Sequence, residues 1–163
     1  MPRTFQAVIL DTPSAYGSVH SPFKQPAGSR LARSGLAVIY NLSSGVDPVV
    51  ESVELRGTAS VVVTLSGLGP DGIEPPRAAA GFELLCAGVW HSALIDASAV
   101  ANNTITLPVP AGCSAPHAIR YIWYDTPCGN FAYQCPIYTT AKALDSLSGE
   151  LTLLPLGPFI QSL

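Results

Sequence analysis

Ala118-Ile119-Arg120-Tyr121-Ile122-Trp123-Tyr124 is the stretch that decides the fold. Its aromatic and β-branched residues are typical of a β-strand, and the signal is the strongest in the chain. Shorter segments of similar character precede it at residues 49–55, 59–65, 81–90 and 103–109, separated by turns. Several short strands at this spacing predict an antiparallel β-sandwich-like domain. The 14 Gly and 15 Pro residues suit a fold that turns often.

The N-terminal part of the chain has a different character. Residues 4–10 form a short apolar run, which predicts a buried strand of a parallel sheet. A loop rich in Pro, Ser and Gly follows at residues 12–21. Residues 24–40 then predict a helix with one apolar face, formed by Leu31, Leu36 and Ile39. A strand, a loop and a helix in this order are typical of the last unit of an α/β domain.

The chain therefore divides into two unequal parts. Residues 1–42 are expected to be the C-terminal tail of an α/β domain, and residues 43–163 a β-rich domain. About forty residues cannot bury a hydrophobic core alone. We therefore expect the chain to be a fragment or a truncated gene product.

Composition excludes several classes of partner. Hydrophobic residues make up 48% of the chain and charged residues 12%, which favours a packed core over disorder. The net charge of −3 offers no basic field for nucleic acid or an anionic membrane surface. No apolar run reaches the roughly 20 residues that a membrane span needs. The first ten residues show no signal peptide.

The four cysteines indicate disulfides. Cys128 and Cys135 are close enough in sequence to close a small loop, which leaves Cys86 to pair with Cys113. Buried free thiols are the alternative. Without a C-x-x-C pair, and with His91 and His117 outside any motif, we expect neither a metal site nor a cofactor.

Two N-glycosylation sequons begin at Asn41 and Asn102. Each is weak evidence alone, because sequons arise by chance. Together with an even number of cysteines, they predict that the full-length parent protein is secreted or lysosomal.

His20 is the candidate catalytic residue. It lies in the loop between the expected strand and helix, and such loops at the carboxyl ends of strands line the ligand crevice of open α/β sheets. A histidine there can act as a general base towards a serine hydroxyl, because its ordinary pKa lies near neutrality. The alternative is a solvated surface histidine.

Two groups of motifs resemble the sialate O-acetylesterase family. The first runs from Met1-Pro2 through Thr4-Phe5 and Asp11 to Gly17-Ser18-Val19-His20 and Lys24-Gln25, and it resembles the stretch with the family's active-site histidine. The second resembles the family's C-terminal domain and comprises Ile119-Arg120-Tyr121-x-Trp123, Pro127-Cys128, Gln134-Cys135-Pro136-Ile137-Tyr138 and Leu154-Pro155-x-x-Pro158-Phe159-Ile160. The resemblance covers nearly the whole chain, although residues 45–110 match weakly.

The resemblance implies an SGNH-type carbohydrate esterase. In such an enzyme a serine attacks the acetyl ester of a sialic acid, histidine relays the proton, and an oxyanion hole stabilises the intermediate. Only the histidine maps to this chain, at His20. The family's Gly-x-Ser-Asn motif is absent, and Asp145-Ser146-Leu147 lacks the glycine of a Gly-Asp-Ser-Leu block. We expect this chain to be inactive alone. The implied ligand is an O-acetylated sialic acid or another acetylated sugar.

The sequence departs from the family beside His20. Ser21 stands where the family usually has proline, and Phe23 replaces an expected acidic residue. Asp11 matches a family position and is a candidate for the acid that orients His20. Its nine-residue distance from His20 is unlike the usual Asp-x-x-His spacing, so a strand-end aspartate capping the loop is an equal alternative.

Two other interpretations remain open. The β-rich domain could act alone as a carbohydrate-binding or interaction module, with Trp90, Trp123 and Tyr121 forming a sugar platform, although strand aromatics more often lie in a core. The chain could also be a truncated, non-catalytic paralogue. The sequence indicates no oligomeric state.

Overall fold

The computed structural model describes residues 4–14, 17–42, 47–68, 72–144 and 151–163. Within these ranges the elements are, in chain order, α1 (Lys24–Tyr40), β1 (Val49–Arg56), β2 (Ser60–Ser66), β3 (Phe82–Cys86), β4 (Val89–Ala93), the 3-10 turn η1 (Ala97–Ala99), β5 (Val100–Ala101), β6 (Thr104–Pro108), β7 (Ala118–Tyr121), β8 (Tyr138–Leu144), β9 (Leu151–Pro155) and β10 (Phe159–Ser162). No helix among the described residues is long and apolar enough to cross a membrane.

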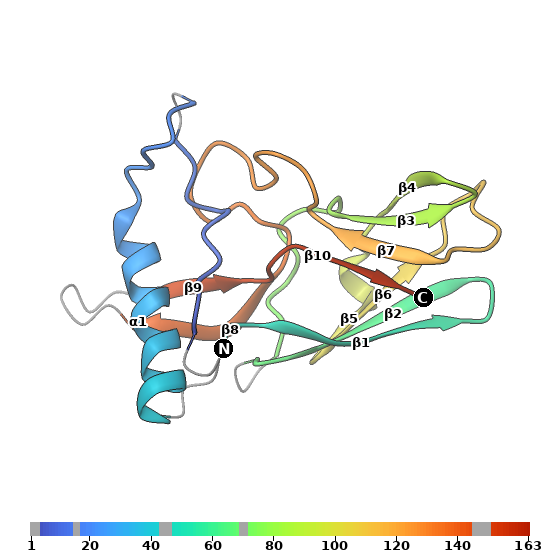
Figure 1. The fold of residues 1–163 in the computed structure, drawn as a ribbon. Coiled ribbons are helices and arrows are strands. Elements are labelled where there is room, and N and C mark those ends of the chain that lie inside the picture. The colour runs from blue at the N-terminus through green and yellow to red at the C-terminus, as the bar shows by residue number, and fades with distance from the viewer. Residues whose placement is uncertain (1–3, 15–16, 43–46, 69–71, 145–150) are drawn as a thin grey trace.

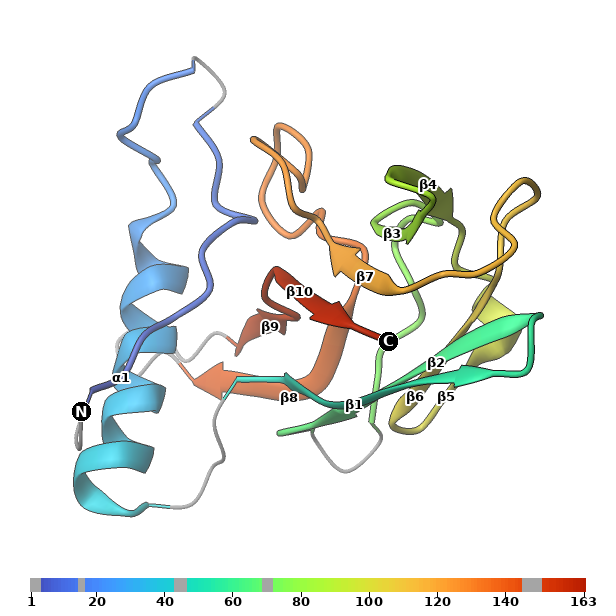
Figure 2. The same cartoon turned by 45° about the vertical axis from the view of Figure 1, so that its right-hand side comes forward.

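Two four-stranded antiparallel sheets form the main body of the fold. One has the strand order β1-β2-β6-β5 and the other β10-β7-β3-β4. The hairpin of β8 and β9 forms a third, smaller sheet, and α1 packs beside it (Figures 1 and 2). The expected antiparallel, mostly β architecture is therefore confirmed.

The core lies between the two larger sheets. Along β2, Val61, Val63 and Leu65 are almost fully buried, and they share one apolar cluster with Ile119 and Tyr121 of β7. Side chains alternate between the faces of a strand, so every second residue of these strands enters the core. The apolar, β-branched character of residues 59–65 is thus explained by their place in this core.

Two of the expected strands have different limits. Residues 81–90 form a hairpin of β3 and β4 rather than one strand, because Ala87 and Gly88 both have positive φ, at 49° and 81°. Positive φ at both central residues is the geometry of a tight two-residue hairpin turn. The strand at residues 118–124 ends at Tyr121, because the backbone of Ile122 turns with φ 40°.

The strand expected over residues 4–10 does not form. These residues are in no sheet of the described structure, and Phe5 and Ile9 are 41% and 50% exposed. An apolar run indicates a tendency to be buried, but a strand also needs a neighbour for its backbone hydrogen bonds. The described residues supply no such neighbour here, so the strand-loop-helix unit is not shown.

Helix α1 has the expected bounds but the opposite orientation. Its buried residues include Arg30 and Arg33, whereas the expected inner face of Leu31, Leu36 and Ile39 is 40–43% exposed. Arg30 faces the protein because its Nε donates to the backbone oxygen of Leu153 in β9, at 2.9 Å. The helical periodicity of the sequence identified the apolar face of α1 correctly. It did not show that the opposite face packs against the rest of the protein.

Candidate active site

His20 lies exposed in the loop that joins the N-terminal segment to α1. Its backbone N–H donates to Ser18 Oγ at 3.1 Å. The Ser21 hydroxyl donates to the Pro13 backbone oxygen at 3.3 Å and accepts from the Phe23 N–H at 3.1 Å. Ser21 therefore braces the two sides of the loop at the position where the related family usually has proline.

A pocket of about 380 Å³ lies beside this loop. His20 is not among its lining residues, but its chain neighbours Val19 and Ser21 are, so the backbone at His20 adjoins the pocket. Three parts of the chain form the walls: residues 9–14 and 17–23, the start of α1, and the loop that follows β7. They contribute Ile9, Leu10, Thr12, Pro13, Ser14, Gly17, Ser18, Val19, Ser21, Phe23, Lys24, Ala27, Thr126 and Pro127. The mixture of apolar surface with a few polar groups is typical of small-molecule sites.

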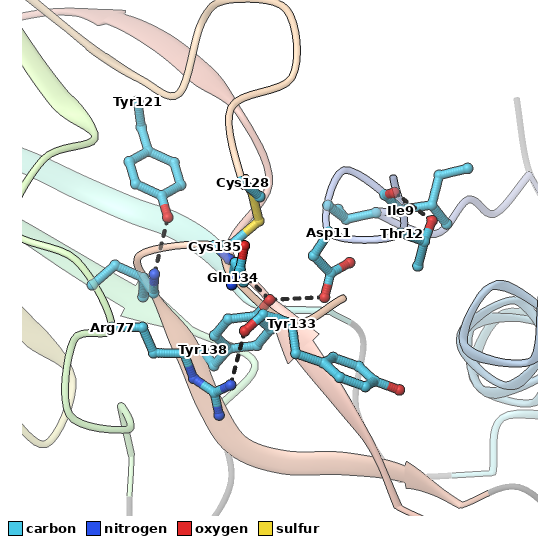
Figure 3. Close-up of a disulfide and its surroundings, with 12 residues drawn as sticks. Ile9, Asp11, Thr12, Arg77, Tyr121, Cys128, Tyr133, Gln134, Cys135 and Tyr138 are labelled. Carbon is cyan, nitrogen blue, oxygen red and sulfur yellow. Dashed lines mark hydrogen bonds between the residues drawn. A yellow bond between two sulfur atoms is a disulfide. The ribbon is translucent and has the colours of Figure 1, made fainter. Parts of the chain in front are cut away.

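Asp11, between the pocket residues Leu10 and Thr12 in the chain, is fully buried. Arg30 donates to both carboxylate oxygens, at 2.6 and 2.8 Å, and the Tyr138 hydroxyl donates to Oδ2 at 2.8 Å. Burial, together with the Asp11 charge, raises the pKa of Tyr138, so the phenol stays protonated as a donor. Figure 3 shows Tyr138 pointing at Asp11. The network joins the N-terminal segment, α1 and β8.

Among the described residues, no hydrogen bond or ion pair joins Asp11 to His20. Both Asp11 carboxylate oxygens accept hydrogen bonds from Arg30, and Oδ2 also accepts one from the Tyr138 hydroxyl. The role of Asp11 as the acid that orients His20 stays a prediction, as does the catalytic role of His20. The local sequence carried no signal for the network, because its partners lie 19 and 127 residues away from Asp11.

Both expected disulfides form, Cys86–Cys113 and Cys128–Cys135. The second closes a loop that reaches the Asp11 network (Figure 3). The Cys135 N–H donates to the Tyr138 hydroxyl and the Tyr133 N–H donates to the Asp11 backbone oxygen, both at 3.1 Å. The loop after β7 is thus fastened to the segment that precedes His20.

The three aromatic residues considered for a sugar platform lie in different environments. Tyr121 is fully buried, and its hydroxyl accepts from the Ile137 N–H at 3.1 Å. The Trp90 ring lies 4.3 Å from the guanidinium carbon of Arg120. Trp123 is 50% exposed. A single platform formed by all three is therefore wrong for this structure, because Tyr121 belongs to the core.

A larger cavity of about 520 Å³ lies away from His20, between residues 4–8, α1 and residues 156–161. Asp47 lines it, and burial raises the pKa of this carboxyl despite the nearby Arg30 and Arg33. The walls are mainly apolar and include Phe5, Val38 and Phe159. They bring no serine together with a histidine.

The structure gives no chemical role to the remaining candidates from the sequence, namely the Asp-Ser-Leu run, a metal site and the two sequons. Asp145-Ser146-Leu147 lies outside the described residues. Among the residues that are described, no group of three or more His, Cys, Asp and Glu side chains is placed to hold a metal ion. Asn41 and Asn102 are exposed, and their glycosylation stays a prediction.

The geometry thus defines a β-sandwich domain with an attached loop and helix, which together form a pocket beside an exposed histidine. Residues 71–162 match the model of the sialate O-acetylesterase C-terminal domain family. The match covers more than half of the chain, which therefore belongs to this family.

The fold is also similar to the crystal structure of a novel carbohydrate acetylesterase from Xanthomonas citri, with a TM-score of 0.71 and 22% sequence identity. The similarity covers 96% of this chain and 32% of that one, so the chain spans about a third of the length of that enzyme. A comparison with curated proteins gave no match.

Proposed function

We propose that this chain is the histidine-bearing C-terminal part of a secreted or lysosomal carbohydrate esterase that removes O-acetyl groups from sialic acids. The observation that carries the proposal is the position of His20, exposed on a braced loop beside a pocket, in a chain of this family. His20 acts as the general base for a serine outside these 163 residues. The two disulfides support an oxidising compartment.

The outer surface of the N-terminal unit supports a second, nucleophile-bearing part. Leu31, Leu36 and Ile39 on α1 and Phe5 and Ile9 before it are each at least 40% exposed. Exposed apolar groups that gather on one unit often mark an interaction surface. We assign it to the rest of an SGNH-type α/β domain, whose neighbouring strand would also give residues 4–10 their missing partner.

Lys24 favours an acidic sugar. It is the sole charged residue among the described residues that line the His20 pocket, and no described ion pair uses it. A sialic acid carries a carboxylate that this ammonium can pair with, whereas an acetylated xylan is neutral. An exposed pair of this kind contributes about 0.2–1 kcal/mol. Lys24→Gln is therefore expected to raise KM a few-fold for acetylated sialic acid and to leave KM for acetylated xylan unchanged.

The main test measures acetate release by the protein read from the coding sequence that extends upstream of Met1, where we expect an in-frame Gly-x-Ser-Asn block. His20→Gln should lower kcat about 10²–10⁴-fold, the usual contribution of a general base. His117→Gln is the matched control, since this exposed histidine follows β6 and does not line the pocket. The control should retain activity within two-fold.

Two results would overturn the proposal. One is full activity in His20→Gln. The other is His20-dependent turnover by the 163-residue chain alone, because a base without a nucleophile has nothing to activate. If the upstream sequence lacks a nucleophile and the β domain still binds glycans, the chain is instead a non-catalytic carbohydrate-binding paralogue.

A further inference from the structure

The wall of the His20 pocket that faces the N-terminal loop comes from the β-sandwich domain. Thr126 and Pro127, which line the pocket, belong to the segment between β7 and the Cys128–Cys135 disulfide. Figures 1 and 2 show this segment and the loop that carries His20 at the same end of the molecule. Any ligand held beside His20 is therefore within reach of the sandwich domain.

Two exposed aromatic side chains lie next to this wall in the chain. Trp123 and Tyr124 are 50% and 53% exposed, whereas Tyr121 just before them is fully buried. Tyr124 is two residues from Thr126, so their Cα atoms are at most about 7 Å apart, and Trp123 is at most about 11 Å away. Large aromatic surfaces normally enter a core or an interface. Neither side chain lines the pocket itself, so they stand exposed beside its Thr126–Pro127 wall, where a ligand larger than the pocket would meet them.

The backbone of this segment is strained and firmly held. Ile122 and Thr126 have φ of 40° and 49°, values that β-branched residues rarely adopt. Such conformations persist where the surroundings impose them, and they concentrate at ligand sites. The Ile122 N–H donates to the Gly81 backbone oxygen at 2.8 Å, and the Cys128–Cys135 disulfide closes the other end.

We propose that Trp123 and Tyr124 extend the Thr126–Pro127 wall of the His20 pocket outward and stack against the ring of the acetylated sugar whose ester His20 addresses. This rests on the proposed function for the identity of the ligand. The pocket chemistry fits a sugar, because hydroxyls of Thr12, Ser18 and Thr126 provide hydrogen-bonding groups among apolar surfaces. The sandwich domain then contributes specificity, while the N-terminal loop contributes the base.

Binding of the methyl glycoside of 9-O-acetyl-N-acetylneuraminic acid to the 163-residue chain tests this directly. Saturation-transfer NMR should show ring protons of the sugar in contact with the wild-type chain, and titration gives Kd. The double variant Trp123→Ala/Tyr124→Ala should weaken binding at least ten-fold. Trp123→Phe, which keeps an aromatic face, should retain binding within about three-fold.

Leu55→Ala is the matched control, because Leu55 is a 42% exposed apolar side chain on β1, outside both the pocket lining and the segment that leads to Thr126. It should leave Kd unchanged, and thermal unfolding of every variant shows whether the fold is intact. Equal Kd values for the wild type and the double variant, or absence of binding by the wild type, would overturn the proposal. Binding needs no nucleophile, so this result is independent of whether acetate release depends on His20.

Discussion

The buried pair of Asp11 and Arg30 gives the sharpest test of how the N-terminal unit is attached. Both side chains are fully buried, and Arg30 also donates to the backbone oxygens of Val8 at 2.7 Å and Leu153 at 2.9 Å. Asp11→Ala removes the balancing charge and leaves a buried guanidinium with two carbonyl acceptors. Breaking a buried pair from one side destabilises a protein by about 3–5 kcal/mol.

The double variant Asp11→Ala/Arg30→Met separates charge from packing. It removes both charges together and keeps an apolar side chain at position 30. Because no unpaired charge then remains buried, we expect the double variant to be more stable than Asp11→Ala alone by about 1–3 kcal/mol. Glu54→Ala is the control, since Glu54 pairs with Arg56 at 3.6 Å on the surface. Its expected effect is below about 1 kcal/mol.

Urea unfolding at pH 7 under oxidising conditions measures the free energy of unfolding for each variant. For a chain of this size, 3–5 kcal/mol corresponds to a decrease in Tm of roughly 6–20 °C. Our reasoning is refuted if Asp11→Ala behaves like Glu54→Ala. It is also refuted if the double variant loses as much stability as the two single changes added together, because the two residues would then act independently.

Three further predictions concern stability and association. Replacing both cysteines of Cys86–Cys113 by serine should destabilise the chain by about 3.6 kcal/mol, and the same change at Cys128–Cys135 by about 2.5 kcal/mol, because the first pair closes the longer loop; urea unfolding of both variants checks the order. Burial raises the pKa of Asp47 in the folded protein. The protonated carboxyl therefore stabilises the fold at pH values below the ordinary aspartate pKa, and this stabilisation is lost as pH rises through the raised pKa. Asp47→Asn should therefore be more stable than the wild type at pH 7, with the gain shrinking towards pH 4, and equal pH profiles would contradict this. Leu31→Glu/Ile39→Glu should change the stability of this chain by less than about 1 kcal/mol but abolish acetate release by the longer protein; retained activity would remove the assigned surface.

The sequence predicted features that depend on local pattern or on simple counting. β7 followed from the aromatic and β-branched residues at 118–124, and the disulfides from cysteine number and spacing. The burial of Tyr121 agrees with the core alternative that the sequence left open. β8, β9 and β10 were missed. β8 and β9 pair with each other, β10 adds to the edge of the β7 sheet, and Pro155 and Pro158 interrupt the strand-like character between β9 and β10.

The candidate site shows the same division between local and distant information. His20 was identified from its motif, and its exposed position agrees with a loop. Its surroundings were not predictable, because Thr126 and Pro127 reach the pocket from more than a hundred residues away. The Asp11 network was missed for the same reason. The sequence around a side chain contains no periodic pattern that identifies its partner elsewhere in the fold.

The two failed expectations in the N-terminal unit have one physical cause. Residues 4–10 and the apolar stripe of α1 both have the sequence character of buried elements, yet Phe5, Ile9 and Leu31 are exposed here. An apolar pattern shows that a segment is suited to a buried position. It does not show which elements are present to bury it. Arg30, on the polar face of α1, pairs with the buried Asp11. Rotating the helix to bury its apolar stripe would therefore break this ion pair. In the proposed function, the rest of the esterase covers both segments.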